Sequence, residues 1–589
     1  MKEFSKYVLA TITGLVIFGI IICILSILSL AGMVASGTSE TSVKKNTVMV
    51  LKLGSVSERS TDNPINVLMG QGTESTGLND ILSAIKKAAS NDKIKGIYIE
   101  GDASTAMSPA TAEAIRHQLL DFKKSKKFII SYADTYSRNA YYIASVADKV
   151  MLNPQGQLEW GGLAGQTMYY KDALDKLGIQ MEVFKVGTYK SAVEPYLLNE
   201  MSDANREQIS SYLGDIWQQT LKDVSASRKI SADSLNAYAN RGILFSEATE
   251  YLKLKLVDKL IYAPEVETEI KDLMKLEKDD NYNKLTIAEM AGVKNAPNKN
   301  KDGKIAVYYA VGQIGGGSTF SNDEVIDQKK VVKDLRKIKD DKDIKAVVFR
   351  VNSPGGSAFD SEQIWKAVTE LKAEKPVVVS MGDYAASGGY YISCAADYIF
   401  AEATTLTGSI GIFGMFPQMG ELLNNKLGVH FSTVKTNEYS DLGDISRPMT
   451  EAERAIMQNN VNRGYELFTK RCADGRKMKQ DDIKKIGEGR VWTGVHAKQI
   501  GLVDELGGLD AAIAKAKKLA KLDEASIMNY PAKSNVLDQL MEEMQGNSYA
   551  DKQLKQTLGD YYPIFTDLKN IGQKTGIQAS MPYFLKFRL

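Results

Sequence analysis

The most uniform apolar stretch of the chain lies near its N-terminus. No charged residue occurs between Lys6 and Glu40, and residues 7–34 are rich in isoleucine and leucine. About 20 apolar residues suffice to cross a bilayer, and this stretch is longer than the apolar core of a cleavable signal peptide. We therefore predict that residues 1–46 form a membrane anchor, with a helix over residues 7–34, and a short connector. A buried helix of a soluble domain is the alternative.

From residue 47 onward, short apolar runs alternate with segments of helical periodicity. The apolar runs at residues 47–53, 95–100 and 128–131 are predicted strands, and residues 112–124 and 201–224 are predicted helices. Strands that alternate with helices favour βα units and largely parallel sheets. The pattern therefore predicts an α/β fold.

This alternating pattern occurs twice. Residues 294–303 lack periodicity and contain several residues that break regular structure, and a strand pattern resumes at residues 304–309. Segments of the first region recur in the second: 92–99 as 343–349, 140–148 as 389–397, 176–179 as 426–429, and 256–260 as 502–506. Such a long internal repeat indicates a duplicated domain. We predict one domain over residues 47–293, a linker over 294–303 and a second domain over 304–528.

Residues 529–589 have no counterpart in the first domain. They are mostly polar, with scattered aromatic residues. No motif assigns a role to this segment, and we predict only that it is a C-terminal extension.

Composition narrows the classes of function. With 44% apolar and 25% charged residues the chain is an ordinary globular protein, and a net charge of +2 gives no reason to expect nucleic acid as a partner. Three cysteines are too few for a disulfide scaffold, and their number does not decide whether Cys394 and Cys472 stay reduced. The three histidines form no close ligand pair, so we predict neither a metal site nor a cofactor.

Ser387 is a candidate nucleophile. The apolar run at residues 376–380 predicts a buried strand, which then turns through small residues into a helix, with Ser387 directly before two glycines. The first turn of a helix has free backbone N–H groups and a positive dipole end, which suit a nucleophile whose product is an oxyanion. A tight strand–helix turn without a catalytic role is the alternative.

The two domains differ at the positions that matter for this chemistry. Aligning Tyr141 with Tyr390 places Arg138 opposite Ser387, so the first domain lacks the serine. Lys190 of the first domain falls opposite Ser440, so the second domain lacks the lysine. A lysine acts as a general base when burial lowers its pKa. One Ser–Lys pair shared between the domains explains both losses, whereas a solvated surface lysine is the alternative.

A glycine-rich turn also occurs only once. Residues 352–357, Asn-Ser-Pro-Gly-Gly-Ser, follow a predicted strand, and their counterparts at residues 102–107 contain neither glycine. Glycines let a backbone approach a ligand closely and present its N–H groups. This favours a role in binding an oxyanion or a substrate backbone, with a simple turn as the alternative.

Four motifs together resemble a known family. Residues 189–195, 352–357, 384–390 and 406–412 are similar to the long, duplicated form of the signal peptide peptidase A family, also called protease IV, a group of Ser–Lys peptidases. The resemblance extends from the apolar N-terminal stretch to about residue 525. Residues beyond that point do not contribute to it.

The resemblance implies a fold and a set of roles. Each domain is expected to be similar to the Clp protease proteolytic subunit and to crotonase. Ser387 is implied as the nucleophile, Lys190 as the general base and acid, and Ser409 as the residue that hydrogen-bonds the lysine. Our candidates for binding the oxyanion and the substrate backbone are three glycines: Gly355, Gly356 and Gly388.

The resemblance also implies a serine endopeptidase that degrades cleaved signal peptides and other hydrophobic peptides. Such proteins are homotetramers, anchored by one helix in the bacterial inner (cytoplasmic) membrane, with their catalytic domains on the periplasmic side. Two other classes share parts of the pattern. A crotonase-like acyl-coenzyme A enzyme would share the fold and the glycines without needing Lys190, and a non-catalytic membrane scaffold would keep the fold alone.

Overall fold

The computed structural model describes most of the chain from residue 41 to residue 532. The described segments are 41–52, 54–59, 76–105, 107–294, 302–315, 325–532 and 577–580, with a few positions between 6 and 21. Within these segments, the structure contains no helix with the length and apolar character needed to cross a membrane. Most of the predicted anchor helix over residues 7–34, and most of the predicted linker over residues 294–303, lie outside the described residues.

The first domain is built on a parallel sheet with the strand order β8-β6-β5-β4-β1-β9. In chain order its strands are β1 (Thr47–Lys52), β4 (Ile94–Glu100), β5 (Phe128–Tyr136), β6 (Lys149–Leu158), β8 (Lys259–Leu260) and β9 (Asn283–Leu285). In chain order, the helices that lie between or after these strands are α3 (Leu78–Ser90), α4 (Pro109–Lys123), α5 (Arg138–Ala144), α9 (Ala232–Asn240), α10 (Ala248–Lys253), α11 (Val266–Met274) and α12 (Ile287–Ala291). Strand β1 contains a continuous apolar run over residues 48–51, as expected where helices cover the sheet.

The second domain repeats this arrangement. Its main path runs β19-β17-β15-β13-β10-β21, and β16 and β20 pair beside β15. The strands are β10 (Lys304–Val311), β13 (Ile344–Ser353), β15 (Val377–Ala386), β16 (Tyr398–Ala401), β17 (Leu406–Gly408), β19 (Val491–Thr493), β20 (Glu505–Leu506) and β21 (Ser526–Tyr530). The helices are α13 (Gln328–Asp340), α14 (Ala358–Lys372), α15 (Gly388–Ser393), α16 (Glu451–Arg476), α17 (Gln480–Ile486), α18 (Gly494–Gln499) and α19 (Leu509–Leu519). The order β5-β4-β1-β9 recurs as β15-β13-β10-β21, which agrees with the predicted α/β duplication.

A third sheet joins the two domains. Its order is β12-β11-β14-β22-β18-β7. Its strands are β7 (Gln180–Val186), β11 (Gln313–Ile314), β12 (Val325–Ile326), β14 (Gly355–Ser357), β18 (Ile412–Gln418) and β22 (Ile577–Ser580). First-domain strand β7 pairs antiparallel with second-domain strand β18 along its whole length, from Val186 opposite Ile412 to Gln180 opposite Gln418. The residues that follow β7 are therefore held against the second domain.

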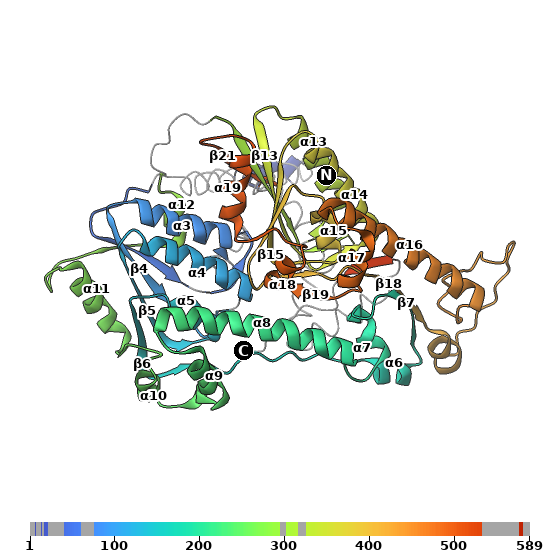
Figure 1. Ribbon diagram of the computed structural model, residues 1–589, viewed down its shortest axis with the longest axis horizontal. Helices are drawn as coiled ribbons and strands as arrows, with labels where there is room; N and C mark the ends of the chain where they lie inside the picture. The colour runs from blue at the N-terminus through green and yellow to red at the C-terminus, as the bar shows by residue number, and fades with distance from the viewer. Residues whose placement is uncertain are drawn as a thin grey trace.

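A long helix of the first domain supports this contact between β7 and the second domain. Helix α8 (Asp203–Arg228) runs across the molecule from the first domain towards α6 (Lys171–Leu177), α7 (Glu194–Leu197) and β7, which lie beside α16 and β18 (Figure 1). Gln208 on α8 donates from Nε2 to the Tyr189 carbonyl at 3.0 Å, and its Oε1 accepts from the N–H of Val491 at 3.2 Å. One side chain thus connects the segment after β7 to a strand of the second domain.

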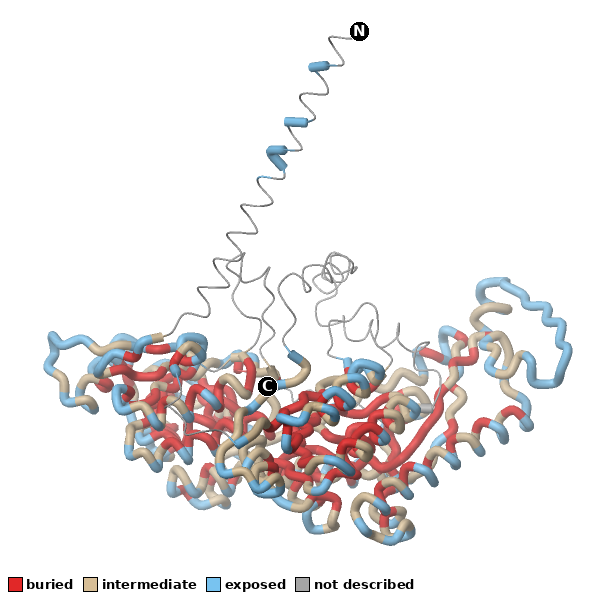
Figure 2. The backbone as a smooth tube through the Cα atoms, turned by 90° about the horizontal axis from the view of Figure 1, so that it is seen from above, coloured by how far each residue is buried: buried red, intermediate tan, exposed pale blue. Residues whose placement is uncertain are grey.

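Buried polar contacts also cross the boundary between the domains. Glu58 and Arg350 form an ion pair with an Oε1–Nη2 distance of 2.7 Å, and both side chains are buried. Asp383 accepts from the Thr111 hydroxyl at 2.7 Å. Figure 2 shows buried backbone in both halves of the molecule, whereas a loop at one end is exposed. These contacts fix the two domains relative to one another.

Candidate active site

Ser387 lies at a sharp turn between strand β15 and helix α15. Its backbone has φ +55° and ψ −112°, a conformation that few non-glycine residues adopt. The N–H of Ser387 donates to the Gly408 carbonyl at 2.7 Å, which holds the turn against β17. Backbone strain of this kind persists where the surrounding structure enforces it, and it is frequent at active sites. The turn brings the buried Ser387 side chain to the boundary with the first domain.

Lys190 reaches Ser387 from the other domain. It follows β7 and precedes a short turn of helix over Ser191–Val193. Its Nζ atom lies 2.8 Å from Ser387 Oγ, and 3.1 Å from both the hydroxyl and the carbonyl oxygen of Ser409. The structure therefore brings the three residues Ser387, Lys190 and Ser409 together, although 197 residues separate the first two in sequence.

The environment of Lys190 favours its neutral form. The side chain is completely buried. Burial lowers the pKa of the Lys190 ammonium well below its ordinary value because a charged group loses hydration there. Its hydrogen-bond neighbours at Nζ are two serines, which carry no charge. A buried, neutral lysine amine next to a hydroxyl can accept that hydroxyl's proton.

Two glycines of the second domain enclose the stem of the lysine. A Cβ atom added at Gly489 would lie 2.7 Å from both Cβ and N of Lys190, and one added at Gly411 would lie 3.1 Å from its Cδ. Gly489 also has φ +78°, which disfavours other residues. The Tyr189 N–H donates to the Glu488 carbonyl at 2.9 Å and fixes the same contact. Sequence reasoning missed Gly489, because no motif of the first domain indicates which second-domain loop faces the lysine.

Ser409 is held in position by its backbone. It stands between β17 and β18 with φ +50°, and its N–H donates to the Arg490 carbonyl at 2.7 Å. Its side chain is fully buried against Lys190. The hydroxyl and carbonyl of Ser409 are therefore fixed acceptors that aim the lysine amine.

The three predicted glycines do not lie in equivalent positions. A Cβ added at Gly355 would lie 2.7 Å from the backbone nitrogen of Gly388, so these two glycines meet directly beside Ser387. The N–H of Gly355 donates to Ser353 Oγ at 3.1 Å and is already used. A Cβ at Gly356 would instead collide with the Ile314 carbonyl. The backbone at Gly355 and Gly388 is thus closely packed next to the nucleophile candidate.

The matching position in the first domain has no such chemistry. Arg138 begins helix α5, is buried, and donates from Nη1 to the Gly162 carbonyl at 2.8 Å. Ser440, the counterpart of Lys190, lies on an exposed loop of the second domain. The residues that face one another therefore form one Ser–Lys pair and no second pair.

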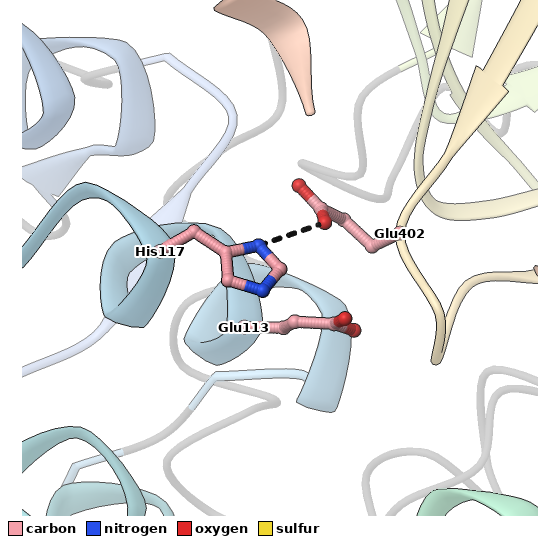
Figure 3. A group of neighbouring side chains, drawn as sticks. All are labelled: Glu113, His117 and Glu402. Atoms are coloured by element: carbon pink, nitrogen blue, oxygen red, sulfur yellow. Dashed lines mark ion pairs between the residues drawn. The ribbon is translucent and has the colours of Figure 1, made fainter. Parts of the chain in front are cut away.

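A further polar cluster joins the domains, and no sequence motif predicts it. Glu113 and His117 on α4 face Glu402, and His117 Nδ1 lies 3.4 Å from Glu402 Oε2 (Figure 3). Burial raises the pKa of Glu113 to about 7, and the Glu402 carboxylate raises the pKa of His117 to about 9. The Glu113 carboxylate accepts from the N–H groups of Ala403 and Thr404. Three such side chains can hold a cation, but the hydrogen bonds already made by Glu113 favour a polar contact between the domains.

Comparison with known proteins gives the family. The model of peptidase family S49 matches residues 121–277 and 369–523, and the Clp protease model matches residues 318–406. The chain belongs to peptidase family S49. The first matched segment contains Lys190 and the second contains Ser387. The predicted family is thereby confirmed; the S49 model matches both predicted copies, and the Clp protease model matches the second copy.

Relatives of this S49 peptidase match most of its length. Protease 4 of Salmonella typhi is 38% identical over 482 residues, which cover 80% of this chain and 77% of the relative. Protease 4 of Haemophilus influenzae is 37% identical over 451 residues, covering 75% and 72%. The chloroplastic serine protease SPPA of Arabidopsis thaliana is 30% identical over 486 residues, covering 82% and 70%. The chain is therefore a serine peptidase.

Proposed function

We propose that this serine peptidase is a membrane-anchored endopeptidase that degrades cleaved signal peptides and other hydrophobic peptides with a Ser387–Lys190 dyad. The observation that carries the proposal is the 2.8 Å approach of the Lys190 amine to the Ser387 hydroxyl across the domain boundary. The same geometry explains why each domain lacks one of the two residues. No metal or cofactor enters the mechanism.

Acylation begins with a proton transfer. Neutral Lys190 takes the proton of Ser387 Oγ, which attacks the carbonyl carbon of the scissile peptide bond. Ser409 accepts from the lysine amine and keeps its lone pair directed at Ser387. Lys190 then gives the proton to the leaving amine. Water enters and the same residues hydrolyse the acyl-enzyme, with Lys190 again as the base.

The tetrahedral oxyanion needs backbone donors. The N–H of Gly388 stands at the first position of α15, directly after the nucleophile. Gly355 packs against this nitrogen and permits a substrate carbonyl to approach, and Gly356 is the second candidate donor. Removing a single donor of an oxyanion hole typically costs about 10²–10³ in kcat. These glycines are candidates for binding the oxyanion because a side chain at Gly355 would block the approach of the substrate carbonyl.

Substrate binding is proposed to use strand addition. In the third sheet, the glycine-rich strand β14 and strand β18 flank the position that β22 occupies. An extended peptide can pair with these strands through its backbone, and apolar pockets for its alternate side chains would select hydrophobic sequences.

Anchoring and assembly complete the proposal. The uncharged stretch over residues 7–34 is the candidate anchor helix in the bacterial inner membrane, with the catalytic domains on the periplasmic side. The loop after β18 exposes large apolar side chains: Leu427, Val429, Phe431, Val434 and Tyr439. Exposed apolar groups gathered on one loop favour contact with another protein surface. We propose this loop as a contact surface in a homotetramer.

The test is hydrolysis of a hydrophobic peptide by the purified full-length protein. We expect the wild type to cut a synthetic signal peptide internally, and Ser387→Ala to be inactive. Ser440→Ala is the matched control, because this serine lies on an exposed loop, and it should cleave like the wild type. Equal cleavage by Ser387→Ala would contradict the proposal, as would hydrolysis of acyl-coenzyme A thioesters without hydrolysis of peptides.

A further inference from the structure

A buried chain of hydrogen-bonded side chains ends beside the candidate general base. Asn205 and Gln208 are three residues apart on α8 and therefore lie on the same face of this helix. Asn205 donates from Nδ2 to Glu194 Oε2 at 2.9 Å, and its Oδ1 accepts from Gln208 Nε2 at 3.1 Å. All three side chains are buried. None of the three takes part in the proton transfers between Ser387 and Lys190.

Gln208 binds the residues on both sides of Lys190. Its Nε2 donates to the Tyr189 carbonyl at 3.0 Å and to Ser191 Oγ at 2.9 Å. The third acceptor is the Asn205 side chain, so the two N–H groups of this amide are shared among three oxygen atoms. Ser191 is also completely buried. Lys190 therefore stands between two residues that one amide group holds.

The other end of the Gln208 amide reaches the second domain. Its Oε1 accepts from the N–H of Val491 at 3.2 Å. The carbonyl of Arg490, the residue before Val491, accepts from the N–H of Ser409 at 2.7 Å. One side chain thus connects the segment of Lys190 to the backbone that holds Ser409, its other hydrogen-bond partner.

The direction of the hydrogen bonds in this chain is determined at both ends. At one end, the Glu194 carboxylate accepts from the N–H of Ser202 at 3.3 Å and from its hydroxyl at 2.6 Å. At the other end, the backbone N–H of Val491 can only donate. Asn205 must therefore turn its NH₂ group towards Glu194. Gln208 must turn its Oε1 towards the strand, which leaves its N–H groups for the lysine segment.

We propose that Glu194, Asn205 and Gln208 are positioning residues that hold Lys190 at hydrogen-bond distance from Ser387 through a chain of fixed polarity. This inference rests on the proposed function, because it takes the lysine as the general base. The group that touches the lysine segment is a neutral amide. A carboxylate in its place would favour the ammonium form of the lysine, which cannot accept a proton.

Removing the amide of Gln208 tests the chain in the full-length protein. Gln208→Met keeps a side chain of similar length without its hydrogen bonds. We expect kcat for peptide hydrolysis to fall at least about tenfold at unchanged KM, because a misplacement of about 1 Å can cost about 10²-fold in rate. Gln219→Met is the matched control. Gln219 is a half-buried residue of the same helix whose amide donates to Asp223, so this variant should keep the wild-type kcat.

The comparison is made on protein that circular dichroism shows to be folded. A folded Gln208→Met variant with the wild-type kcat would overturn the proposal.

A suppressor variant separates positioning from packing. Asn205→Asp keeps the volume but sets a second carboxylate against Glu194, so we expect kcat to fall at least about tenfold. Adding Glu194→Gln lets the new amide donate to the new carboxylate, whose second oxygen again accepts from Gln208. The double variant should therefore recover to within about threefold of the wild-type kcat.

These rates are compared on the plateau at high pH, where the lysine amine is neutral in each variant. A double variant as slow as Asn205→Asp alone would contradict a chain of fixed polarity.

Labelling with a fluorophosphonate separates this inference from the proposed function, because the label on Ser387 requires the dyad but no peptide. If labelling slows in Gln208→Met and the wild type cleaves no peptide, positioning stands and the peptidase proposal for hydrophobic peptides fails. If peptides are cleaved and both Gln208→Met and Asn205→Asp keep the wild-type kcat, the function stands and positioning fails.

Discussion

Substituting Gly489 by alanine should disable the enzyme although neither member of the dyad is replaced. The added methyl group would stand 2.7 Å from Cβ and N of Lys190 and 2.8 Å from its Cα. Carbon atoms in favourable contact are about 3.5–4.0 Å apart, so the two segments must separate by about 0.8 Å. Because the contact involves the backbone of Lys190, a side-chain rotation cannot relieve it. The amine must therefore move relative to Ser387.

The size of the effect follows from this displacement. A misplacement of about 1 Å in a catalytic group can cost about 10²-fold in rate, so we expect Gly489→Ala to lower kcat by about 50-fold. A left-handed backbone conformation in a residue other than glycine costs a further 1–2 kcal/mol or so of stability, roughly the same at any comparable position. A loss of stability alone therefore does not identify the displacement of Lys190. A lower kcat in folded protein does.

A second glycine supplies the control for Gly489→Ala. Gly162 has φ +81°, close to the φ of +78° at Gly489, but a Cβ there meets nothing within 4 Å. Both variants would be compared by thermal unfolding and by the initial rate of peptide hydrolysis at saturating substrate. Gly162→Ala should lose similar stability and retain its kcat. If Gly489→Ala retains the wild-type kcat, the lysine is not positioned by this contact, and the reasoning is refuted.

Three further predictions concern charge and stability. Lys190→Met should be inactive, and denaturant unfolding at pH 7 should show it to be about 1–3 kcal/mol more stable than the wild type. Because burial lowers the pKa of Lys190, this difference in stability should shrink as the pH rises towards 10.5. A variant less stable than the wild type would contradict the prediction. Glu58→Gln should lose about 3 kcal/mol, since it leaves Arg350 buried without its partner; an unchanged unfolding midpoint would argue against this. The pKa of His117 is raised from 6.5 to about 9, so its pairing with Glu402 stabilises fully below pH 6.5 and is lost as pH rises through about 9; His117→Gln should remove this pH dependence, worth about 1 kcal/mol after solvent screening.

Local features of the site could be predicted from the sequence because neighbouring residues determine them. The small residues around Ser387 and the apolar run before them define a strand, a turn and a helix within one short segment. The comparison of the two copies added the contrast between Arg138 and Ser387. A lysine that one copy keeps and the other lacks is therefore a sound candidate partner.

Contacts between distant segments could not be predicted in the same way. The pairing of β7 with β18 and the approach of Gly489 to Lys190 depend on how the two domains pack, and no periodicity encodes that packing. Glu402 meets His117 for the same reason. Strand β22 lies in a segment of otherwise polar sequence, and four residues are too few to show a strand pattern. Each of these features depends on tertiary contacts rather than on local preference.

The central claim is that Lys190 of one domain activates Ser387 of the other. Its most direct test is labelling of the full-length protein with a fluorophosphonate, with the modified residue identified by peptide mass spectrometry. We predict a label on Ser387 in the wild type, a rate that rises with pH as the Lys190 amine loses its proton, and almost no label in Lys190→Ala. Labelling of Ser387 at the wild-type rate in folded Lys190→Ala would contradict the shared dyad.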